Sequence, residues 1–276
     1  MDLFGSDLND DSNEKIKALD ELFLKSSAYR NSSEYLSLLN FINRFPKLSP
    51  FNAFLIHMQN SGVQIVLPAA RWAKYGRTVK YQSRPLVILM PFGPVSFVYD
   101  IADTEGKPIP DHLINLFTTA GEFNPLIYNR IIMNCSKENI LLREEVMHKS
   151  SAGFAKHKNG IFSITINSSY SVNEKYSTLI HELAHIFCGH LGVNEQSWWK
   201  NRESIDTTIA EIEAESISFL VCKRIGLETT SEAYLSNYIS KHSQIPPISF
   251  DSILTISLHI EKMSNDGFLS KTKKKK

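Results

Sequence analysis

Two histidines lie four residues apart in the stretch STLIHELAHIFCGHLG, residues 177 to 192, with a glutamate between them. Apolar residues surround His181, Glu182 and His185, which predicts a largely buried helix. Positions i and i+4 share one face of a helix, so both imidazoles would converge on one point. Buried polar side chains are costly without a partner, and imidazole nitrogen is a good zinc ligand. The spacing therefore predicts a Zn²⁺ site that needs a third protein ligand from elsewhere.

Glu182 has a different predicted role, because it lies about 100° around the helix from His181. From there it can point towards a metal-bound water, take its proton as general base and pass the proton to a leaving amine. The ion would lower the pKa of that water towards roughly 7. These residues predict a metalloendopeptidase that hydrolyses a peptide bond in a protein or peptide substrate.

His190 is one candidate for the third ligand. Metzincins place a glycine three residues and a histidine six residues after the second histidine, which here are Cys188 and Leu191. Gly189 and His190 are each out of register by one, so the metzincin pattern fails. We expect His190 at the end of the helix, with a role near the substrate as a second interpretation. Together with Tyr170 and Tyr176, it is also a candidate to stabilise the oxyanion of the reaction.

A second predicted helix, AEIEAESISFLVC, offers a better third ligand. Its polar residues at intervals of four, three and four share one face: Glu211, Glu215, Ser218 and Cys222. If this face meets the histidines, Glu211 completes a site of two histidines and one glutamate with an open fourth position. Glu215 would then orient an imidazole through its other nitrogen; the reverse assignment, with Glu215 as ligand, stays open. Glu213 lies about 200° from Glu211 around a helix and is expected to face away.

A basic segment over residues 71–84 carries positive side chains at intervals of three or four without one acidic residue. They are Arg71, Lys74, Arg77, Lys80 and Arg84, interleaved with Trp72, Tyr75 and Tyr81. Basic groups that follow phosphates, with aromatic faces for base stacking, are typical of single-stranded DNA binding. The competing interpretation is a solvated helix edge whose aromatic residues belong to the core.

The elements that must position these residues can be predicted from periodicity and turn signals. Helices are expected over 13–27, 32–45, 48–60 (with Ser49 as cap), 111–117, 207–226 (closed by Gly226), 231–242 and 249–263, besides the histidine helix. Strands are expected over 85–92, 94–101 and 161–167, with Gly93 and Pro94 at the first turn. The turn-rich segment 103–111 is a candidate boundary, and residues 118–160 show no clear pattern.

The motifs HELAH and EIEA resemble those of the ImmA/IrrE-type metallopeptidases, and the segment ITIN at 164–167 is similar to the strand that precedes their first helix. The resemblance implies a gluzincin-like α+β peptidase core. It also implies His181, His185 and Glu211 as ligands and Glu182 as base.

The amino-terminal half resembles the single-stranded-DNA-binding domain of ArdC-type antirestriction proteins. The matching segments are NFINRFPKLSPFNAFLIHMQN, ARWAKYGRTVKY, PLVILMPF and VYDIADTEGKPIPD. In that family such a domain precedes a peptidase domain, which implies an α+β chain with DNA-associated antirestriction or regulatory proteolysis. The expected organisation is an acidic disordered tail over 1–12, an ArdC-like domain over 13–105, a mostly helical peptidase domain over 106–265 and a basic disordered tail over 266–276.

Composition and charge limit the classes of function that the chain can have. The 276 residues carry 30 basic and 29 acidic side chains, so no overall charge favours nucleic acid or a membrane surface. No apolar run approaches a membrane span, and three unpatterned cysteines favour a reduced, cytoplasmic setting. The alternative function is a DNA-binding antirestriction protein whose zinc site is structural, closed by Cys188 or His190 as fourth ligand. A third reading is a regulatory adaptor, and nothing in the sequence sets the oligomeric state.

Overall fold

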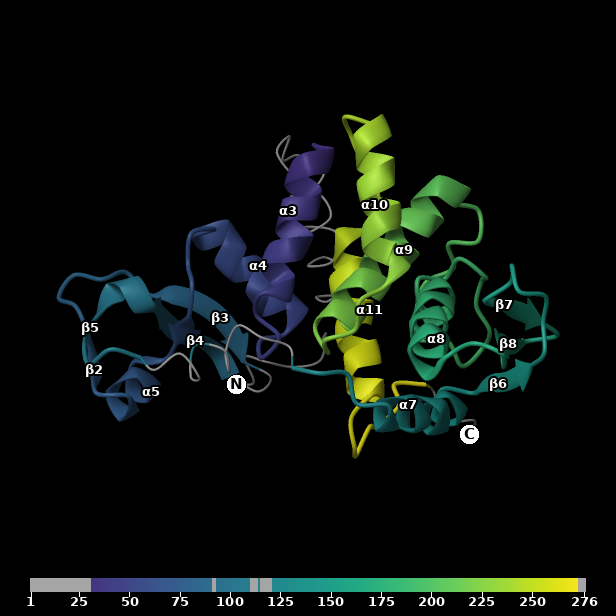
Figure 1. Ribbon diagram of the computed structural model, residues 1–276, viewed down its shortest axis with the longest axis horizontal. Helices are drawn as coiled ribbons and strands as arrows, with labels where there is room; N and C mark the ends of the chain where they lie inside the picture. The colour runs from purple at the N-terminus through teal and green to yellow at the C-terminus, as the bar shows by residue number, and fades with distance from the viewer. Residues whose placement is uncertain (1–30, 91–92, 110–113, 115–120, 273–276) are drawn as a thin grey trace, which may run out of the picture. The chain divides into compact units, whose positions relative to one another are not determined.

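The computed structural model of the chain describes residues 31–90, 93–109, 114 and 121–272 (Figure 1). It confirms the α+β class, with helices and three small sheets. Two compact units form, the first from Met1–Leu36, Asn124–Val221 and Thr229–Lys276, the second from Ser37–Phe123 and Cys222–Glu228. The acidic tail, the helix expected over 13–27, most of that over 111–117 and the last four residues lie outside the described residues. The predicted domain limits stay predictions.

The second unit contains a three-stranded antiparallel sheet in the order β1-β4-β3 and a separate pair β2-β5. Its elements are α4 (Pro50–Gln59), β1 (Val66–Leu67), α5 (Ala69–Lys74), β2 (Arg77–Val79), β3 (Leu86–Met90), β4 (Gly93–Asp100) and β5 (Thr104–Gly106). The predicted cap is confirmed, since the Ser49 side chain accepts from the backbone of Asn52. The turn predicted at Gly93 and Pro94 is wrong: both residues begin β4, and Gly93 pairs with Met90.

Two side-chain amides of α4 cover the open edge of β3. Asn52 exchanges two hydrogen bonds with the backbone of Leu89, at 3.0 and 2.9 Å. About two helical turns further on, Gln59 exchanges two hydrogen bonds with the backbone of Val87, both at 2.8 Å. The helix thus satisfies backbone groups that another strand would otherwise bond, which protects this edge from pairing with a second chain.

The first unit holds the predicted chemistry. Its sheet has the order β6-β8-β7, with β6 parallel and β7 antiparallel to the central β8. The helix carrying the histidines, α8, contacts β7 and β8 as well as α11 (Figure 1). The elements are α7 (Leu126–Lys137), β6 (Ile140–Glu145), β7 (Gly153–Lys158), β8 (Ile161–Asn167), α8 (Val172–Phe187), α9 (Thr207–Lys223), α10 (Thr230–Lys241) and α11 (Phe250–Met263). The helix α3 (Ser32–Asn43) begins in this unit.

Both ends of α8 are fixed by local chemistry. At its start, the Ser171 hydroxyl accepts from the backbone of Glu174 while the Glu174 carboxylate accepts from the backbone of Ser171, a reciprocal capping box. At its end, Gly189 adopts φ +76°, and a Cβ at this residue would lie 1.9 Å from the carbonyl oxygen of Lys200. Only glycine lets the following loop pass this close, and the Gly189 carbonyl then accepts from the backbone of Arg202 at 2.9 Å. The end of α8 thereby sets the position of Arg202.

The carboxyl-terminal residues differ from the disordered tail expected from residue 266. Phe268 is only 6% exposed, and the Thr272 hydroxyl donates to the buried carboxylate of Glu138 at 2.6 Å. The Lys271 ammonium lies over the ring of Trp198, 4.6 Å from its centroid. An aromatic anchor and polar contacts hold this segment as far as residue 272, which the basic composition alone did not indicate. Among the helices described, none is long and apolar enough to cross a membrane.

Candidate metal centre

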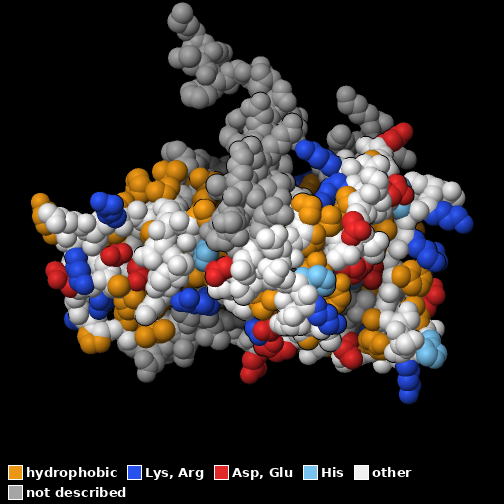
Figure 2. All heavy atoms as spheres, turned by 90° about the horizontal axis from the view of Figure 1, so that it is seen from above, with side chains coloured by type: hydrophobic (Ala, Val, Ile, Leu, Met, Phe, Trp, Pro, Cys, Tyr) orange, Lys and Arg blue, Asp and Glu red, His pale blue; other side chains and the backbone are white. Residues whose placement is uncertain are grey.

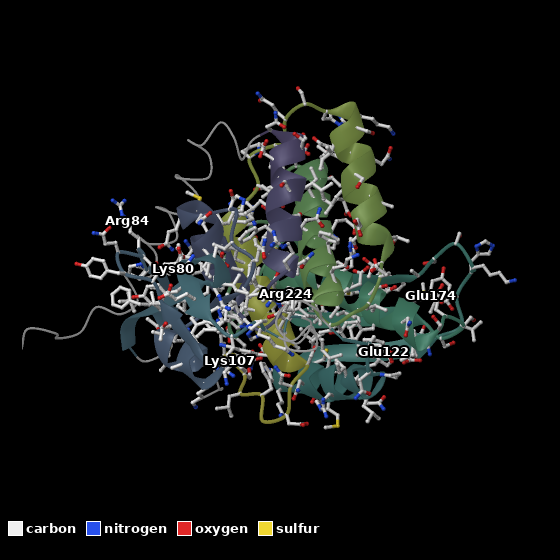
Figure 3. The ribbon with its side chains drawn as sticks, turned by 60° about the vertical axis from the view of Figure 1, so that its left-hand side comes forward. Lys80, Arg84, Lys107, Glu122, Glu174 and Arg224 are labelled. Atoms are coloured by element: carbon white, nitrogen blue, oxygen red, sulfur yellow. The ribbon has the colours of Figure 1, made fainter. Side chains whose placement is uncertain are left out.

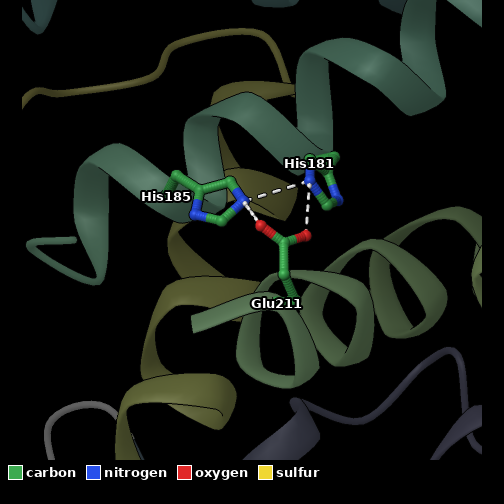
Figure 4. A group of neighbouring side chains, drawn as sticks. All are labelled: His181, His185 and Glu211. Carbon is green, nitrogen blue, oxygen red and sulfur yellow. Dashed lines mark hydrogen bonds and ion pairs between the residues drawn. The ribbon is translucent and has the colours of Figure 1, made fainter. Parts of the chain in front are cut away.

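Three side chains from α8 and α9 converge on one point (Figure 4). The Nε2 atoms of His181 and His185 lie 3.0 Å apart. The Glu211 carboxylate places one oxygen 3.4 Å from Nε2 of His185 and the other 3.6 Å from Nε2 of His181. The structure therefore brings together the three residues that the sequence predicted as ligands.

The separations fit a divalent metal ion. Nitrogen and oxygen ligands about 2.0 to 2.1 Å from a tetrahedral zinc ion would be separated from one another by about 3.3 Å. The observed separations of 3.0 to 3.6 Å bracket that value. Burial, together with the neighbouring His181 and His190, lowers the pKa of His185 to about 3, so this imidazole is neutral as a ligand must be. These residues can hold a divalent ion.

Glu182 stays outside the ligand group and beside it. Burial raises the pKa of Glu182 to about 7, a hydrogen bond from the Ala155 backbone acts against this, and the negative charge of Glu211 adds to it. Its side chain lines the same cavity as His181. A carboxylate that titrates near neutral pH beside a metal centre matches the demands on a general base.

Glu215 approaches the opposite nitrogen of one histidine. Its Oε1 lies 3.5 Å from Nδ1 of His181, whereas Glu211 faces Nε2 of that ring. The geometry thus favours Glu211 as the ligand and gives Glu215 the orienting position, the first of the two assignments left open by the sequence. Burial raises the pKa of Glu215.

The other histidine is supported by a chain of buried polar groups that the sequence did not reveal. Nδ1 of His185 lies 3.0 Å from Nδ1 of His190, whose Nε2 lies 3.0 Å from Oε2 of Glu213. The Arg202 guanidinium donates to both Glu213 oxygens, at 2.6 and 2.7 Å, and the Ser249 backbone donates to one of them at 2.6 Å. Glu213 does not belong to the group that converges with Glu211, but it is fully buried, which its angle around α9 did not indicate.

This chain fixes which nitrogen of His185 carries hydrogen. If Nε2 is to offer a lone pair to a metal ion, Nδ1 must be protonated and donate to His190. His190 must then accept at Nδ1 and donate from Nε2 to Glu213. Burial acts to raise the pKa of Glu213, but the hydrogen bonds from His190 and Arg202 hold it below its usual value. The acceptor at the end of the chain is therefore ionised at neutral pH.

The same contacts argue against a closed structural site. His190 meets His185 at Nδ1, away from the Nε2 atoms that converge, so it does not supply a fourth ligand. Cys188 lies with His190 and Glu213 in a second group of ligand-type atoms. Both oxygens of Glu213 already accept from Arg202, which makes that second group a poor cation site. Among the described residues, three ligands converge and the fourth position is open.

The oxyanion candidates from the sequence are placed elsewhere. The hydroxyl of Tyr176 is buried against that of Ser264, at 2.9 Å, and the hydroxyl of Tyr170 donates to the carbonyl of Lys149. Tyr234 on α10 is a better candidate that the sequence did not single out. Burial raises the pKa of Tyr234, and the negative charges of Glu211 and Glu215 raise it further. It is 38% exposed and accessible to a substrate.

The basic segment 71–84 divides into structural and exposed residues. Trp72 is fully buried in a small core and its indole donates to the carbonyl of Tyr99, so it is not available to stack on a base; Tyr75 packs against the same core. Arg77 donates to Thr104 and to the carbonyl of Lys107, and Lys80 to that of Ala102. The remaining members are exposed: Arg71, Lys74, Tyr81 and Arg84.

Two exposed residues of this segment stand out. Tyr81 is 94% exposed, and the Arg84 side chain extends away from the ribbon near Lys80 (Figure 3). On the face shown in Figure 2, basic side chains that the structure describes are interspersed with acidic and apolar ones and form no continuous patch.

Comparison with known proteins gives a limited result. No protein family model matches the sequence, and no curated protein matches it. A metal-free crystal structure of the antirestriction ArdC protein from plasmid R388 is similar with a TM-score of 0.39 and 13% identity, over 86% of this chain and 95% of that one. The Mn(II)-bound structure of the same protein gives 0.36 and 12%, over 83% and 93%. At these scores the likeness assigns neither a family nor a function to this chain.

Proposed function

We propose that the first unit is a zinc-dependent metallopeptidase. The observation that carries this proposal is the convergence of two Nε2 atoms and one carboxylate, with Glu182 beside them. His181, His185 and Glu211 would hold the ion, which supplies Lewis acidity towards the peptide carbonyl and the attacking water. Glu182 takes a proton from that water and returns it to the leaving nitrogen. Its pKa near 7 suits both steps at neutral pH.

The site has room for a substrate. A cavity of about 240 Å³ reaches both His181 and Glu182, so the reacting groups are not enclosed as they would be in a structural site. We assign Tyr234 as the donor of a hydrogen bond to the developing oxyanion, since the charges of Glu211 and Glu215 both act on its pKa. A DNA-associated protein is the substrate class we expect, for antirestriction or regulatory proteolysis.

Two substitutions test the proposal. Glu182→Gln should keep one zinc ion per chain and abolish cleavage of a random peptide library, read by mass spectrometry. Glu211→Ala should lose the zinc. Glu203→Gln, in an exposed loop, is the matched control and should retain both properties. Full cleavage by Glu182→Gln, or full zinc content in Glu211→Ala, would overturn the proposal.

For the second unit we propose single-stranded DNA binding, favoured by one observation. The Tyr81 side chain is almost fully exposed, and Lys80 and Arg84 lie one residue before it and three residues after it in the sequence. The residue that follows Tyr81, Gln82, has a left-handed backbone conformation with φ +70°. A base stacked on such a ring contributes about 1 to 3 kcal/mol. Tyr81→Ala in the full chain should therefore weaken binding of a labelled oligothymidylate roughly 5- to 150-fold. Equal binding by the variant, or binding that does not weaken with salt, would remove this function.

A further inference from the structure

We propose that the cavity beside His181 and Glu182 is a substrate subsite for a lysine or arginine side chain, an inference that rests on the peptidase function proposed above. The cavity lies between the start of β7, the first half of α8, α9 and the start of α10. Besides the groups of the metal centre, its lining consists mainly of small hydroxyl side chains: Ser177, Thr178, Ser218, Thr230 and Ser231. At about 240 Å³ it is smaller than a typical ligand pocket and suits one side chain.

The hydroxyl groups face the cavity mainly as acceptors. Ser177 and Thr178 both donate to the carbonyl of Glu174, at 3.1 and 2.8 Å. The Ser231 hydroxyl donates to that of Ser218 at 3.0 Å. A hydroxyl has one hydrogen to donate and two lone pairs to accept with. Three of the five hydroxyls have thus committed their hydrogen to the protein, and an occupant finds lone pairs.

Two carboxyl groups lie in the same wall. Glu215 lines the cavity with a side chain that is 15% exposed, and its Oε2 is buried with no hydrogen-bond partner among the described residues. Glu182 lines it as well. No lysine or arginine is among the described residues of the lining. The cavity therefore offers an occupant mainly acceptors and, among the described lining residues, no lysine or arginine charge, so an occupant that brings donors fits it best.

A basic side chain meets these requirements. The lysine ammonium offers three donors and the arginine guanidinium five, and neither has an acceptor. An aliphatic side chain would leave the acceptors without partners, and a carboxylate would bring further acceptors to face those already in the wall. Gly153 shows that the wall is closely fitted, since a Cβ there would lie 2.7 Å from Cγ2 of Thr178. Cleavage is thus directed next to a basic residue.

Binding can be tested without hydrolysis. Metal-free full-length protein would be titrated with Nα-acetyl-lysine methylamide and with the norleucine derivative, which has a similar length without the charge. Amide signals of Thr178 and Ser231 should shift with the lysine compound and not with the norleucine one. Glu215→Gln should weaken the lysine interaction at least tenfold, and Thr178→Val, which keeps its shape, should weaken it as well. Glu203→Gln, in an exposed loop and not among the lining residues, should leave it unchanged.

The outcomes separate the two proposals. Lysine-selective binding without cleavage of any peptide would sink the peptidase and leave the subsite in place. Cleavage of a peptide library with no preference for a basic residue on either side of the cut would sink the subsite alone. Equal binding of both derivatives, no binding of either, or a lysine interaction that survives both Glu215→Gln and Thr178→Val would also overturn it. In the zinc-loaded protein, the ratio of kcat/KM for lysine over norleucine peptides should fall at least tenfold in Glu215→Gln.

Discussion

His185 and His190 face each other through their Nδ1 atoms, 3.0 Å apart. Ligand histidines usually donate their second nitrogen to a carboxylate, a carbonyl or water. Here a second imidazole stands between His185 and the carboxylate of Glu213. His181 has the simpler arrangement, with Glu215 near its Nδ1. His181 and His185 thus have different supports, and the chain through His190 reaches the fully buried carboxylate of Glu213, which pairs with Arg202.

This chain predicts that residues remote from the metal control its affinity. Glu213→Gln removes the charge that receives hydrogen bonds from His190 and Arg202, so the zinc Kd should rise roughly 10- to 100-fold. His190→Ala should have a similar effect. The double variant should be little worse than either single one, because both act through the same chain. Competition with a chelator measures the Kd, with Glu195→Gln in an exposed loop as control. Additive losses would show that the two residues act independently.

The raised pKa of Glu182 predicts how stability depends on pH in the metal-free protein. Burial moves this pKa from 4.5 in the unfolded chain to about 7 in the folded one. Between these values the folded state holds more protons, so the free energy of unfolding falls as pH rises. The full shift corresponds to about 3 kcal/mol at pH 8. Glu182→Gln should remove this loss and raise the Tm at pH 8 by roughly 5 °C or more, with a much smaller gain at pH 5.

Thermal unfolding in the presence of a chelator checks this expectation. His185 acts in the opposite sense: its pKa is lowered to about 3 by burial, so its contribution to stability is lost as pH falls below 6.5. Both proteins share that loss, and the difference between them isolates Glu182. An equal Tm for the two proteins at pH 8 would mean that the carboxylate is solvated in the folded state.

The sequence could predict those parts of the site whose residues lie within a single helix. His181, Glu182 and His185 form a local pattern, and the spacing of Glu211 and Glu215 places both on one face of α9. The burial of Glu213 was not predicted, because a helical angle describes one helix and says nothing of its neighbours. Its partners come from outside α9: Arg202 from the loop before the helix and Ser249 from the segment before α11. Only tertiary packing could reveal that pairing.

The sheet shows the same division between local and distant information. The central strand β8 is buried and apolar, and its sequence pattern predicts it correctly. The strands on either side carry charged residues, and β6 is largely exposed while β7 is mostly half-buried, so their sequences resemble loops. Their pairing depends on β8, to which each is hydrogen-bonded along its length. Periodicity could not identify them because only one strand of the three is enclosed.

Tyr234 gives a prediction about the reaction itself. If its hydroxyl stabilises the oxyanion, Tyr234→Phe should lower kcat roughly 10- to 1000-fold while KM and zinc content change little, because the bond is made chiefly in the transition state. Tyr238→Phe, one helical turn on, is the matched control on the same helix. Steady-state kinetics on one cleaved peptide gives kcat and KM for both variants. An unchanged kcat would leave the oxyanion to another donor.

We expect Arg224, which is not part of the candidate metal centre, to contribute strongly to the free energy of unfolding. It is 5% exposed, and its guanidinium donates to a set of backbone carbonyls between α3 and α4: those of Ile42, Phe45, Pro46 and Leu48. Arg224→Met keeps most of the apolar stem and removes every donor. Each buried carbonyl left unpaired costs about 1 to 3 kcal/mol, so we expect a loss of at least about 3 kcal/mol in the free energy of unfolding.

Substitution of the neighbouring Lys223 is the matched control for substitution of Arg224. Lys223 pairs with Glu228 on the surface, at 2.7 Å, and an exposed ion pair contributes about 1 kcal/mol or less. Urea unfolding of Lys223→Met should therefore show a small change beside a large one for Arg224→Met. Arg224→Lys should recover only part of the loss, because a single ammonium cannot follow the planar fork of the guanidinium to several carbonyls. Similar midpoints for the two methionine variants would show that the carbonyls find water when the guanidinium is removed.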